Sequence, residues 1–415
     1  MVNVSCLVFE HGLVDSGCFS KWERSNMTRI VSFEIKGLSG RKGVVQHHLN
    51  TDVNVFWGPN GSGKTSMLKI LHSALSGNTE VLHSVAFTSA RVEFYSEDRN
   101  QNIVREISKR DIQQAEEEYV DEIYDAETSE LVYVKTTKSE KPALWRTTPK
   151  PIRSSLRYTH RWLPISRILS TPPRSPHRRV MEKRARSLDL DEAFAAGIEQ
   201  RWADWRFRAN REIRAAQDHA LAAVLEVALR GVRKRDQSIE PLDVHQAYQL
   251  VTDFFSERTN PRMGFAFRDF GEFESRYNED SILPDIVQRL QKVELEVAKL
   301  LAPQRRLEEL VRTLYTEGRT VTFGDDGISV SVNGADIPLR HLSSGERQLL
   351  VILLECLDAG SNSVLIDEPE LSMHVAWQNK LVECMRTVSP SAQLIMATHS
   401  PEIMAELEDR CIIEL

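Results

Sequence analysis

The residues from Gly58 to Thr65 combine the types that bind a polyphosphate. They read GPNGSGKT, which matches the pattern G-x-x-x-x-G-K-[ST]. The glycines let the backbone wrap phosphate groups with its N–H groups pointing inward, and the helix that starts here adds its positive end. In this pattern Lys64 reaches the β- and γ-phosphates and Thr65 ligates Mg²⁺. The octapeptide therefore predicts a nucleoside triphosphate site.

Polar residues also follow two short apolar runs near the C-terminus. Asp367 and Glu368 come directly after the run 364–366, and His399 lies just beyond the run 394–396. Ligands of open α/β sheets bind where parallel strands end, so we expect these side chains to meet there. Asp367 could hold Mg²⁺ through water, and Glu368 could orient or deprotonate an attacking water. A histidine at this edge can touch a γ-phosphate.

A third segment, 341–348, reads HLSSGERQ and precedes an apolar helix at 349–357. Its Ser-Ser-Gly turn predicts a second helix start that suits an anion.

Hydrophobic periodicity indicates the elements that must position these residues. An apolar stretch at 53–57 precedes the glycine loop and a helix at 66–75 follows it, which is the context that the pattern requires. A stretch rich in Pro, Arg and Ser at 146–176 predicts a loop. We further expect strands within 29–57 and at 84–95, 103–107 and 131–136, a hairpin at 320–333 that turns at 324–327, and helices at 178–230, 241–255 and 285–317, the last interrupted at Pro303.

Composition favours a soluble intracellular protein. The 415 residues allow two to three domains, and no apolar run approaches the roughly 18 residues of a membrane helix. We found no signal-peptide pattern, so we expect a cytoplasmic protein without a membrane partner. Scattered spacing predicts reduced thiols for the five cysteines Cys6, Cys18, Cys356, Cys384 and Cys411.

Charge is unevenly distributed along the chain, whose net charge is −7. The stretch 141–186 holds 13 Lys and Arg and one acid, whereas 116–130 holds eight acids and no base. The basic stretch is a candidate contact for the phosphate backbone of DNA or RNA. It is equally a candidate solvated linker, or a surface that docks onto the acidic segment of the same chain.

The ordered set GPNGSGKT, LSSGERQ, VLIDEPELSMH and ATHSP resembles the ATP-binding-cassette ATPase family. It is most similar to the branch with the structural-maintenance-of-chromosomes and OLD-family ATPases. The sequence DEPE-x-S-x-H, with Trp377-Gln378 nearby, resembles that of small bacterial AAA-type ATPases. Several of these serve anti-phage systems such as Septu and PARIS. The motifs cover about 29–75 and 320–415, and the middle is covered only loosely.

The resemblance implies roles for individual residues. Asp367 is the Walker B acid, Glu368 the catalytic base and His399 the switch histidine, with Lys64 assisting catalysis. Thr65 and Asp367 hold the metal, and Ser372 lies in a segment that crosses between subunits. Pro164 to Arg167 resembles part of the branch's Q-loop region. ATP contacts are implied for Gly58, Asn60, Gly61, Ser62, Gly63, Lys64, Thr65 and Ser66, and for Ser343 and Gly345 on the nucleotide of another subunit.

The implied fold is an α/β P-loop NTPase of ABC-ATPase type, with a mixed sheet, an N-terminal antiparallel β subdomain and a helical insertion. We expect a weakly ordered extension at 1–26, an N-terminal ATPase lobe at 27–140, a basic linker and helical insertion at 141–318, and a C-terminal lobe at 319–415. The family's shared site implies a homodimer or higher oligomer around Mg-ATP.

Three biological roles stay open. The first is a regulatory ATPase of an anti-phage system, with a separate nuclease or toxin as effector. A separate chain is expected because only 16 residues follow His399 and no nuclease pattern is visible. The second is a chromosome-maintenance or repair ATPase that binds DNA through 141–186. The third is the ATP-binding subunit of a transporter, which the long stretch between the motifs disfavours.

Overall fold

The protein divides into two compact units. Unit 1 comprises residues 1–194 and 342–415, and unit 2 comprises residues 195–341. These limits differ from the insertion boundaries at 141 and 318 that we expected from the sequence. The structure, a computed structural model, describes residues 28–114, 119–124, 131–136, 145–148, 161–164, 190–230, 240–256, 267–279, 282–315 and 318–415.

A parallel sheet forms the centre of unit 1, with strand order β15-β3-β14-β13-β9. Every residue of β13 and β14 is buried, as expected for strands covered on both faces. In the register of the sheet, Asp367 at the end of β13 lies beside Ala397 of β14. The strands are β3 (Val53–Trp57), β9 (Arg161–Pro164), β13 (Ser363–Asp367), β14 (Gln393–Thr398) and β15 (Ile412–Glu414).

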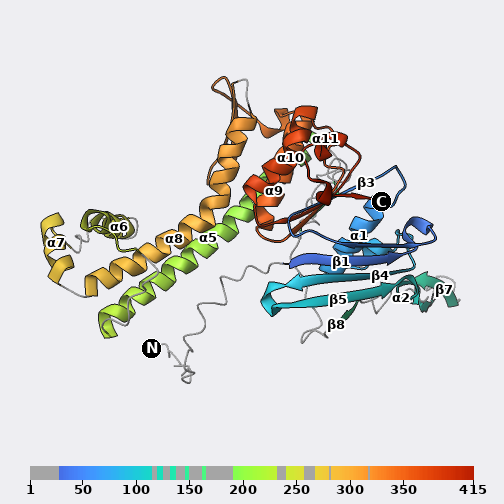
Figure 1. The fold of residues 1–415 in the computed structure, drawn as a ribbon, viewed down its shortest axis with the longest axis horizontal. Coiled ribbons are helices and arrows are strands. Elements are labelled where there is room, and N and C mark those ends of the chain that lie inside the picture. The colour runs from blue at the N-terminus through green and yellow to red at the C-terminus, as the bar shows by residue number, and fades with distance from the viewer. Residues whose placement is uncertain are drawn as a thin grey trace. The chain divides into compact units, whose positions relative to one another are not determined.

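An antiparallel sheet of order β2-β1-β4-β5-β8 forms the second layer of unit 1 (Figure 1). Its apolar residues, including Phe33 and Phe94, share one core cluster with Leu68 of helix α1 and with Leu365 and Ile395 of the parallel sheet. The β strands on this layer alternate buried and less buried positions, which is the period-2 pattern of a sheet with one covered face. They are β1 (Thr28–Lys36), β2 (Val44–His48), β4 (Ser89–Ser96), β5 (Gln101–Ser108) and β8 (Arg146–Thr148).

The helices of unit 1 connect these strands. Helix α9 is buried on nearly every side, which agrees with its almost continuous apolar sequence. A two-stranded antiparallel hairpin, β6 (Tyr119–Tyr124) with β7 (Leu131–Thr136), completes the described part of this unit. The helices are α1 (Lys64–Ser76), α2 (Lys109–Gln114), α9 (Ser344–Ala359), α10 (Val375–Val388) and α11 (Pro401–Met404), with short 3-10 turns at 38–40, 80–82, 97–99 and 409–411.

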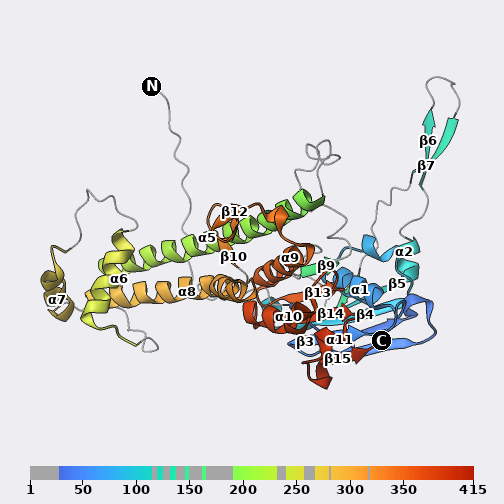
Figure 2. The same cartoon turned by 90° about the horizontal axis from the view of Figure 1, so that it is seen from above.

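Unit 2 is mainly helical. Helices α6 and α7 lie at the N-terminal end of α8 in both views (Figures 1 and 2), and they share an apolar cluster built around Phe273. The indole of Trp202 stacks on Trp205 and donates a hydrogen bond to the carbonyl of Gly324 at 2.8 Å. The elements are α5 (Leu190–Arg230), which begins in unit 1, α6 (Val244–Ser256), α7 (Phe270–Glu279), α8 (Ile282–Leu314), β10 (Arg319–Phe323), β11 (Ile328–Val332), β12 (Ala335–Ile337) and a 3-10 turn at 339–341.

The structure confirms the predicted α/β fold class, with its antiparallel N-terminal sheet, and the hairpin at 320–333. Among the described strands, the expected mixed sheet is two sheets, one parallel throughout and one antiparallel throughout. Three local predictions are also corrected. The stretch 146–176 was expected to be loop, but β8 and β9 lie in it, and β9 pairs in parallel with β13. Helix α8 continues through Pro303, where we expected an interruption. Helix α7 was not predicted at all. These errors share a cause, since pairing and packing with distant residues outweigh weak local preferences.

None of the described helices is long and apolar enough to cross a membrane. Cys356, Cys384 and Cys411 are buried free thiols, as expected. The other two cysteines and the extension 1–26 lie outside the described residues. So do most of the basic stretch 141–186 and the residues after Pro164 in the Q-loop-like segment.

Candidate nucleotide-binding and catalytic site

The glycine loop connects the end of β3 to the start of α1. Gly58, Gly61 and Gly63 all have positive φ, which only glycine adopts readily. A Cβ on Gly58 would lie 2.7 Å from the carbonyl oxygen of Leu415, and one on Gly63 would lie 2.8 Å from the hydroxyl of Ser39. The loop therefore requires glycine at these two positions for conformation and for space.

Lys64 is buried beneath this loop, with 5% of its surface exposed. Its ammonium donates to the carbonyl oxygens of Gly58 at 2.7 Å and Pro59 at 3.3 Å. Burial lowers the pKa of Lys64, and the charges of three nearby acids, Glu368 first, oppose that effect. The buried hydroxyl of Ser62 has no hydrogen-bond partner among the described residues. The loop thus offers a buried cation and an unsatisfied polar group, which suits an anionic ligand.

The remaining residues of the loop and of the first turn of α1 are partly accessible. Asn60 and Gly61 are exposed at the turn, and Ser66 is half-buried in the first turn of α1. The hydroxyl of Thr65 donates to Oδ1 of Asp367 at 3.1 Å. This hydrogen bond joins the glycine loop to the end of β13.

Asp367 is buried, with 3% of its surface exposed. Burial raises the pKa of this carboxyl to about 6, because burial disfavours the charged form more than the hydrogen bond from Thr65 favours it. A buried carboxylate beside a hydroxyl is a natural place for a cation, which would lower that pKa again. The described residues contain no cluster of three or more His, Cys, Asp or Glu that could hold a metal alone. The oxygens of Thr65 and Asp367 fit Mg²⁺, an ion that usually keeps several waters and uses phosphate oxygens as further ligands.

Glu368 follows in a left-handed conformation with φ 54°. This conformation is uncommon for residues other than glycine and costs energy, so it is a feature often found at functional sites. The backbone N–H of Glu368 donates to the carbonyl of Ala397 at 2.8 Å, which continues the ladder between β13 and β14. The side chain is half-buried at the carboxyl edge of the sheet.

His399 is exposed one residue beyond β14. Its backbone N–H donates to Oε1 of Glu370 at 2.7 Å. Glu370 was not predicted to be a site residue, although it lies two residues after Glu368 in the DEPE segment. The ends of β3, β13 and β14 thus bring the glycine loop, both acids of the Asp367-Glu368 pair and His399 to one edge.

Ser343 and Gly345 lie at the start of α9. Ser343 caps the helix: its hydroxyl accepts from the N–H of Glu346 at 3.3 Å, and the Glu346 carboxylate accepts from the N–H of Ser343 at 2.7 Å. A Cβ on Gly345 would lie 2.6 Å from the carbonyl oxygen of Ser372. The described contacts of these residues are therefore with α9 itself and with the loop after β13, rather than with the glycine loop.

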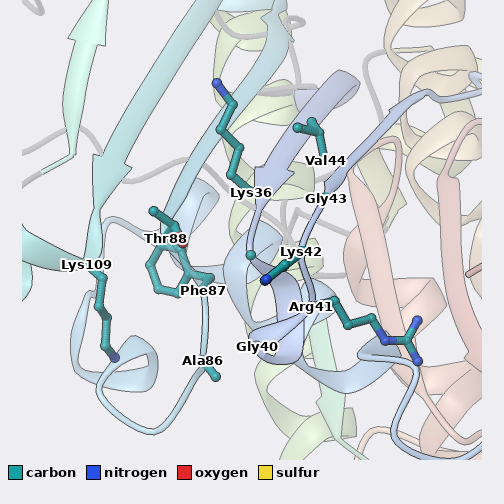
Figure 3. Close-up of a pocket in the computed structure, with 11 residues that line it drawn as sticks. Lys36, Gly40, Arg41, Lys42, Gly43, Val44, Ala86, Phe87, Thr88 and Lys109 are labelled. Carbon is teal, nitrogen blue, oxygen red and sulfur yellow. The ribbon is translucent and has the colours of Figure 1, made fainter.

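A hollow of about 670 Å³ lies at one end of the antiparallel sheet of unit 1, lined mostly by the β1–β2 connection and the residues just before β4 (Figure 3). The hollow is basic and was not predicted, although the Gly-x-x-Gly-Arg-Lys-Gly wording of 37–43 could have drawn attention to it. Arg41 on its wall donates to the carbonyl of Gly61 at 3.4 Å, so the hollow borders the glycine loop. Lys109 has a structural role there, because its ammonium donates to the carbonyls of Leu82, His83 and Val85. The basic residues that line it are Lys36, Arg41, Lys42 and Lys109.

A family model described as "AAA domain, putative AbiEii toxin, Type IV TA system" matches residues 53–405. The match covers most of the chain and includes every residue of the site. The chain belongs to this AAA-domain family.

Two relatives match shorter stretches of the AAA-domain chain. The "Retron Vc95 probable ATPase" of Vibrio cholerae serotype O1 biovar El Tor is 31% identical over 121 residues, which are 25% of this chain and 24% of the relative. The "Septu protein PtuA" of Bacillus thuringiensis is 29% identical over 92 residues, 19% of this chain and 23% of the relative. The matched region thus spans about a quarter of each relative.

One solved structure that aligns with this chain is an Smc head domain from Pyrococcus furiosus. It carries an extended coiled coil and is bound to the C-terminal domain of ScpA. The alignment covers 94% of this chain and 93% of the Smc chain. That alignment has a TM-score of 0.41 and 14% identity.

Proposed function

We propose that this chain is an ATPase that binds Mg-ATP at the carboxyl edge of β3, β13 and β14 and hydrolyses it. The hydrogen bond from Thr65 to Asp367 carries the proposal, because it joins two residues 302 positions apart at the point where the triphosphate and the metal would meet. A buried lysine, a buried carboxylate and a half-buried glutamate converge there, which is the set that phosphoryl transfer needs.

The residues have separate roles in this proposal. The glycine loop and Lys64 bind the phosphate groups and stabilise the charge that develops on them. Glu368 orients the attacking water in line with the γ-phosphorus and accepts its proton. His399 contacts the γ-phosphate from the end of β14. A Mg²⁺ ion bound by Thr65 and Asp367 would neutralise charge on the phosphate oxygens.

A second subunit completes the site in this proposal. Ser343 is exposed at the N-terminus of the 16-residue helix α9, where a helix dipole attracts anions. Its described contacts leave it apart from the glycine loop of its own chain. We propose that it contacts the γ-phosphate held by another copy, so that ATP stabilises a homodimer.

Two substitutions separate binding from hydrolysis. Lys64→Ala should weaken ATP binding at least about 10-fold in calorimetry, because a charge-assisted contact to phosphate is lost. Glu368→Gln should retain ATP binding, lose at least about 100-fold in turnover and accumulate a dimer with ATP in light scattering. Lys380→Ala and Glu383→Gln, at exposed positions of α10, are matched controls that should behave as wild type. Normal turnover of Glu368→Gln would show that another group is the base.

We further propose that hydrolysis regulates a separate effector protein. Support comes from the family model, whose description names a toxin system, and from relatives named as a retron ATPase and a Septu protein. The test is copurification of the chain with the products of neighbouring genes, with and without ATP. The absence of any ATP-dependent partner would count against it. Hydrolysis stimulated by DNA and steeply weakened by salt would instead favour a nucleic-acid role for 141–186.

A further inference from the structure

The segment 368–373, between β13 and α10, contains an acid that the proposed reaction does not yet use. Glu370 places Oε1 2.7 Å from the backbone nitrogen of His399, from which it accepts a hydrogen bond. A carboxylate that accepts from a backbone N–H makes a charge-assisted bond, which is stronger than a neutral one. The position of His399 is therefore tied to the segment that begins with Glu368.

The second oxygen of Glu370, Oε2, is fully buried and has no hydrogen-bond partner among the described residues. Leaving a buried charged oxygen unsatisfied costs free energy, so Glu370 contributes position to His399 rather than stability to the fold. The charge of Glu370 also acts on the site, since it opposes the effect of burial on the pKa of Lys64. The carboxyl thus contacts the backbone of His399 and acts on Lys64 through its charge.

A second link joins the same two segments. The Gln378 side chain donates from Nε2 to the carbonyl of Met373 at 2.8 Å, and its Oε1 accepts from the hydroxyl of Ser400 at 2.7 Å. With Glu370, this glutamine ties 370–373 to 399–400 at two points. Two such links hold a loop far better than one, because together they restrict rotation about either contact.

The start of α9 also contacts this segment. Nε2 of Gln348 donates to the carbonyl of Pro369 at 2.7 Å, and Gly345 packs against the carbonyl of Ser372. A displacement of 368–373 would therefore disturb its contacts with α9 and, through Glu370, the hydrogen bond to the backbone of His399. The segment is held between the helix that carries Ser343 and the strand end that carries His399.

We propose that Glu370 is a positioning residue for His399, holding the backbone of the histidine in register with Glu368 so that both meet the γ-phosphate together. This inference rests on the proposed ATPase function and extends it to a residue outside the glycine loop and the Asp367-Glu368 pair. Glu370 itself does not touch the reacting atoms. It acts through the backbone N–H of His399, and Gln378 supports the same segment from its other side.

Two readouts test the role, one of which needs no activity. In the nucleotide-free protein, hydrogen–deuterium exchange at the His399 amide should be slow in the wild type and faster in Glu370→Ala, whereas Glu370→Gln retains an acceptor and the protection. In turnover, Glu370→Ala should lose about 10- to 100-fold in kcat with little change in KM, the usual loss when a group that orients a reacting side chain is removed. Glu370→Gln should recover most of that loss.

Glu370→Leu, which fills similar volume without an acceptor, replaces Glu370→Ala if the alanine variant does not fold, and Glu383→Ala is the matched acid control on α10. An unchanged kcat and an unchanged His399 exchange rate in the alanine or leucine variant would overturn the inference. So would a glutamine variant as impaired as alanine. An inactive wild type would instead refute the proposed ATPase, and the exchange measurement would still decide whether Glu370 holds His399.

Discussion

Units 1 and 2 bury different kinds of residues. Along the edge of its parallel sheet and in α9, unit 1 buries ionisable and amide groups, among them Lys64, Asp367, Glu346 and Gln348. Within the described part of unit 2, Asp285 is the one charged residue that is buried, and Arg289 one turn later pairs with it at 3.4 Å. Its core is otherwise apolar and aromatic, centred on Phe273 in the cluster of α6, α7 and α8.

Unit 2 exposes two leucines on one face of a helix. On α5 of unit 2, Leu225 is 60% exposed and Leu229 84% exposed, one helical turn apart. Unit 1 places strained backbone and an unsatisfied hydroxyl at the edge of its parallel sheet, as Glu368 and Ser62 show. Burying polar groups costs stability, and proteins accept that cost mainly where chemistry requires it. At the sheet edge, buried ionisable groups such as Lys64 and Asp367 lie at the proposed site, whereas the core of unit 2 holds mainly apolar side chains.

The largest effect is expected in the core of unit 2. Phe273→Ala should lower the free energy of unfolding by about 3–5 kcal/mol, because a fully buried ring is replaced by a cavity. ATP affinity should change less than about 2-fold, since the described contacts of Phe273 lie within unit 2. Urea unfolding and calorimetric titration measure the two quantities. A parallel loss of ATP affinity would show that the nucleotide site of unit 1 depends on the core of unit 2.

A glycine in each unit gives the next contrast. Gly345→Ala should cost about 1–3 kcal/mol and at least about 10-fold in turnover, because its Cβ would lie 2.6 Å from a backbone oxygen of Ser372 that cannot easily move. Gly271→Ala, in α7, meets an ordinary contact of 3.4 Å and should be neutral or stabilising by up to about 1 kcal/mol. Thermal unfolding and ATPase rates test the pair. Equal effects at both positions would contradict the contrast.

Removing the buried charge at the sheet edge should stabilise the nucleotide-free protein. The pKa of Asp367 is raised to about 6, so the folded state binds a proton between about pH 4 and pH 6 that the unfolded state has lost. Stability from this group is therefore present at low pH and is lost as the pH rises through 6. Asp367→Asn should gain about 1–3 kcal/mol at pH 7.5, and the gain should vanish toward pH 4. No gain at pH 7.5 would mean that the buried charge of Asp367 does not lower the free energy of unfolding.

The smallest effect is expected at a surface cluster of unit 1. A hydrogen bond from Arg410 lowers the pKa of Asp52 to about 2, and the two side chains make a bidentate pair at 3.1 and 2.9 Å. The stabilisation is present above about pH 4 and is lost as the pH falls toward 2. Arg410→Ala should therefore lower the Tm by about 1–3 °C at pH 7, since Arg410 is half exposed, and should raise the midpoint pH of acid unfolding. A Tm loss that persists at pH 2 would exclude the ion pair as its cause.

Much of the site was predictable because its residues sit in local patterns. A glycine loop between a strand and a helix, and acids directly after a buried run, are visible without an alignment. Glu370 was missed because its role depends on an N–H that lies 29 positions away. The same holds for β9, a four-residue strand that exists through pairing with β13, and for Pro303, which the packed helix α8 accommodates.

Local sequence was enough to predict the strand–loop–helix at 53–76, the buried runs of β13 and β14, and the order of the motifs, because backbone conformation and hydrophobic patterning are local properties. Packing of distant segments brings Thr65 to Asp367, Gly345 to Ser372, and the Glu370 carboxylate to the N–H of His399. These contacts depend on the register of parallel strands that pair across long stretches of chain. That register is set by packing of the whole sheet, and no local pattern encodes it.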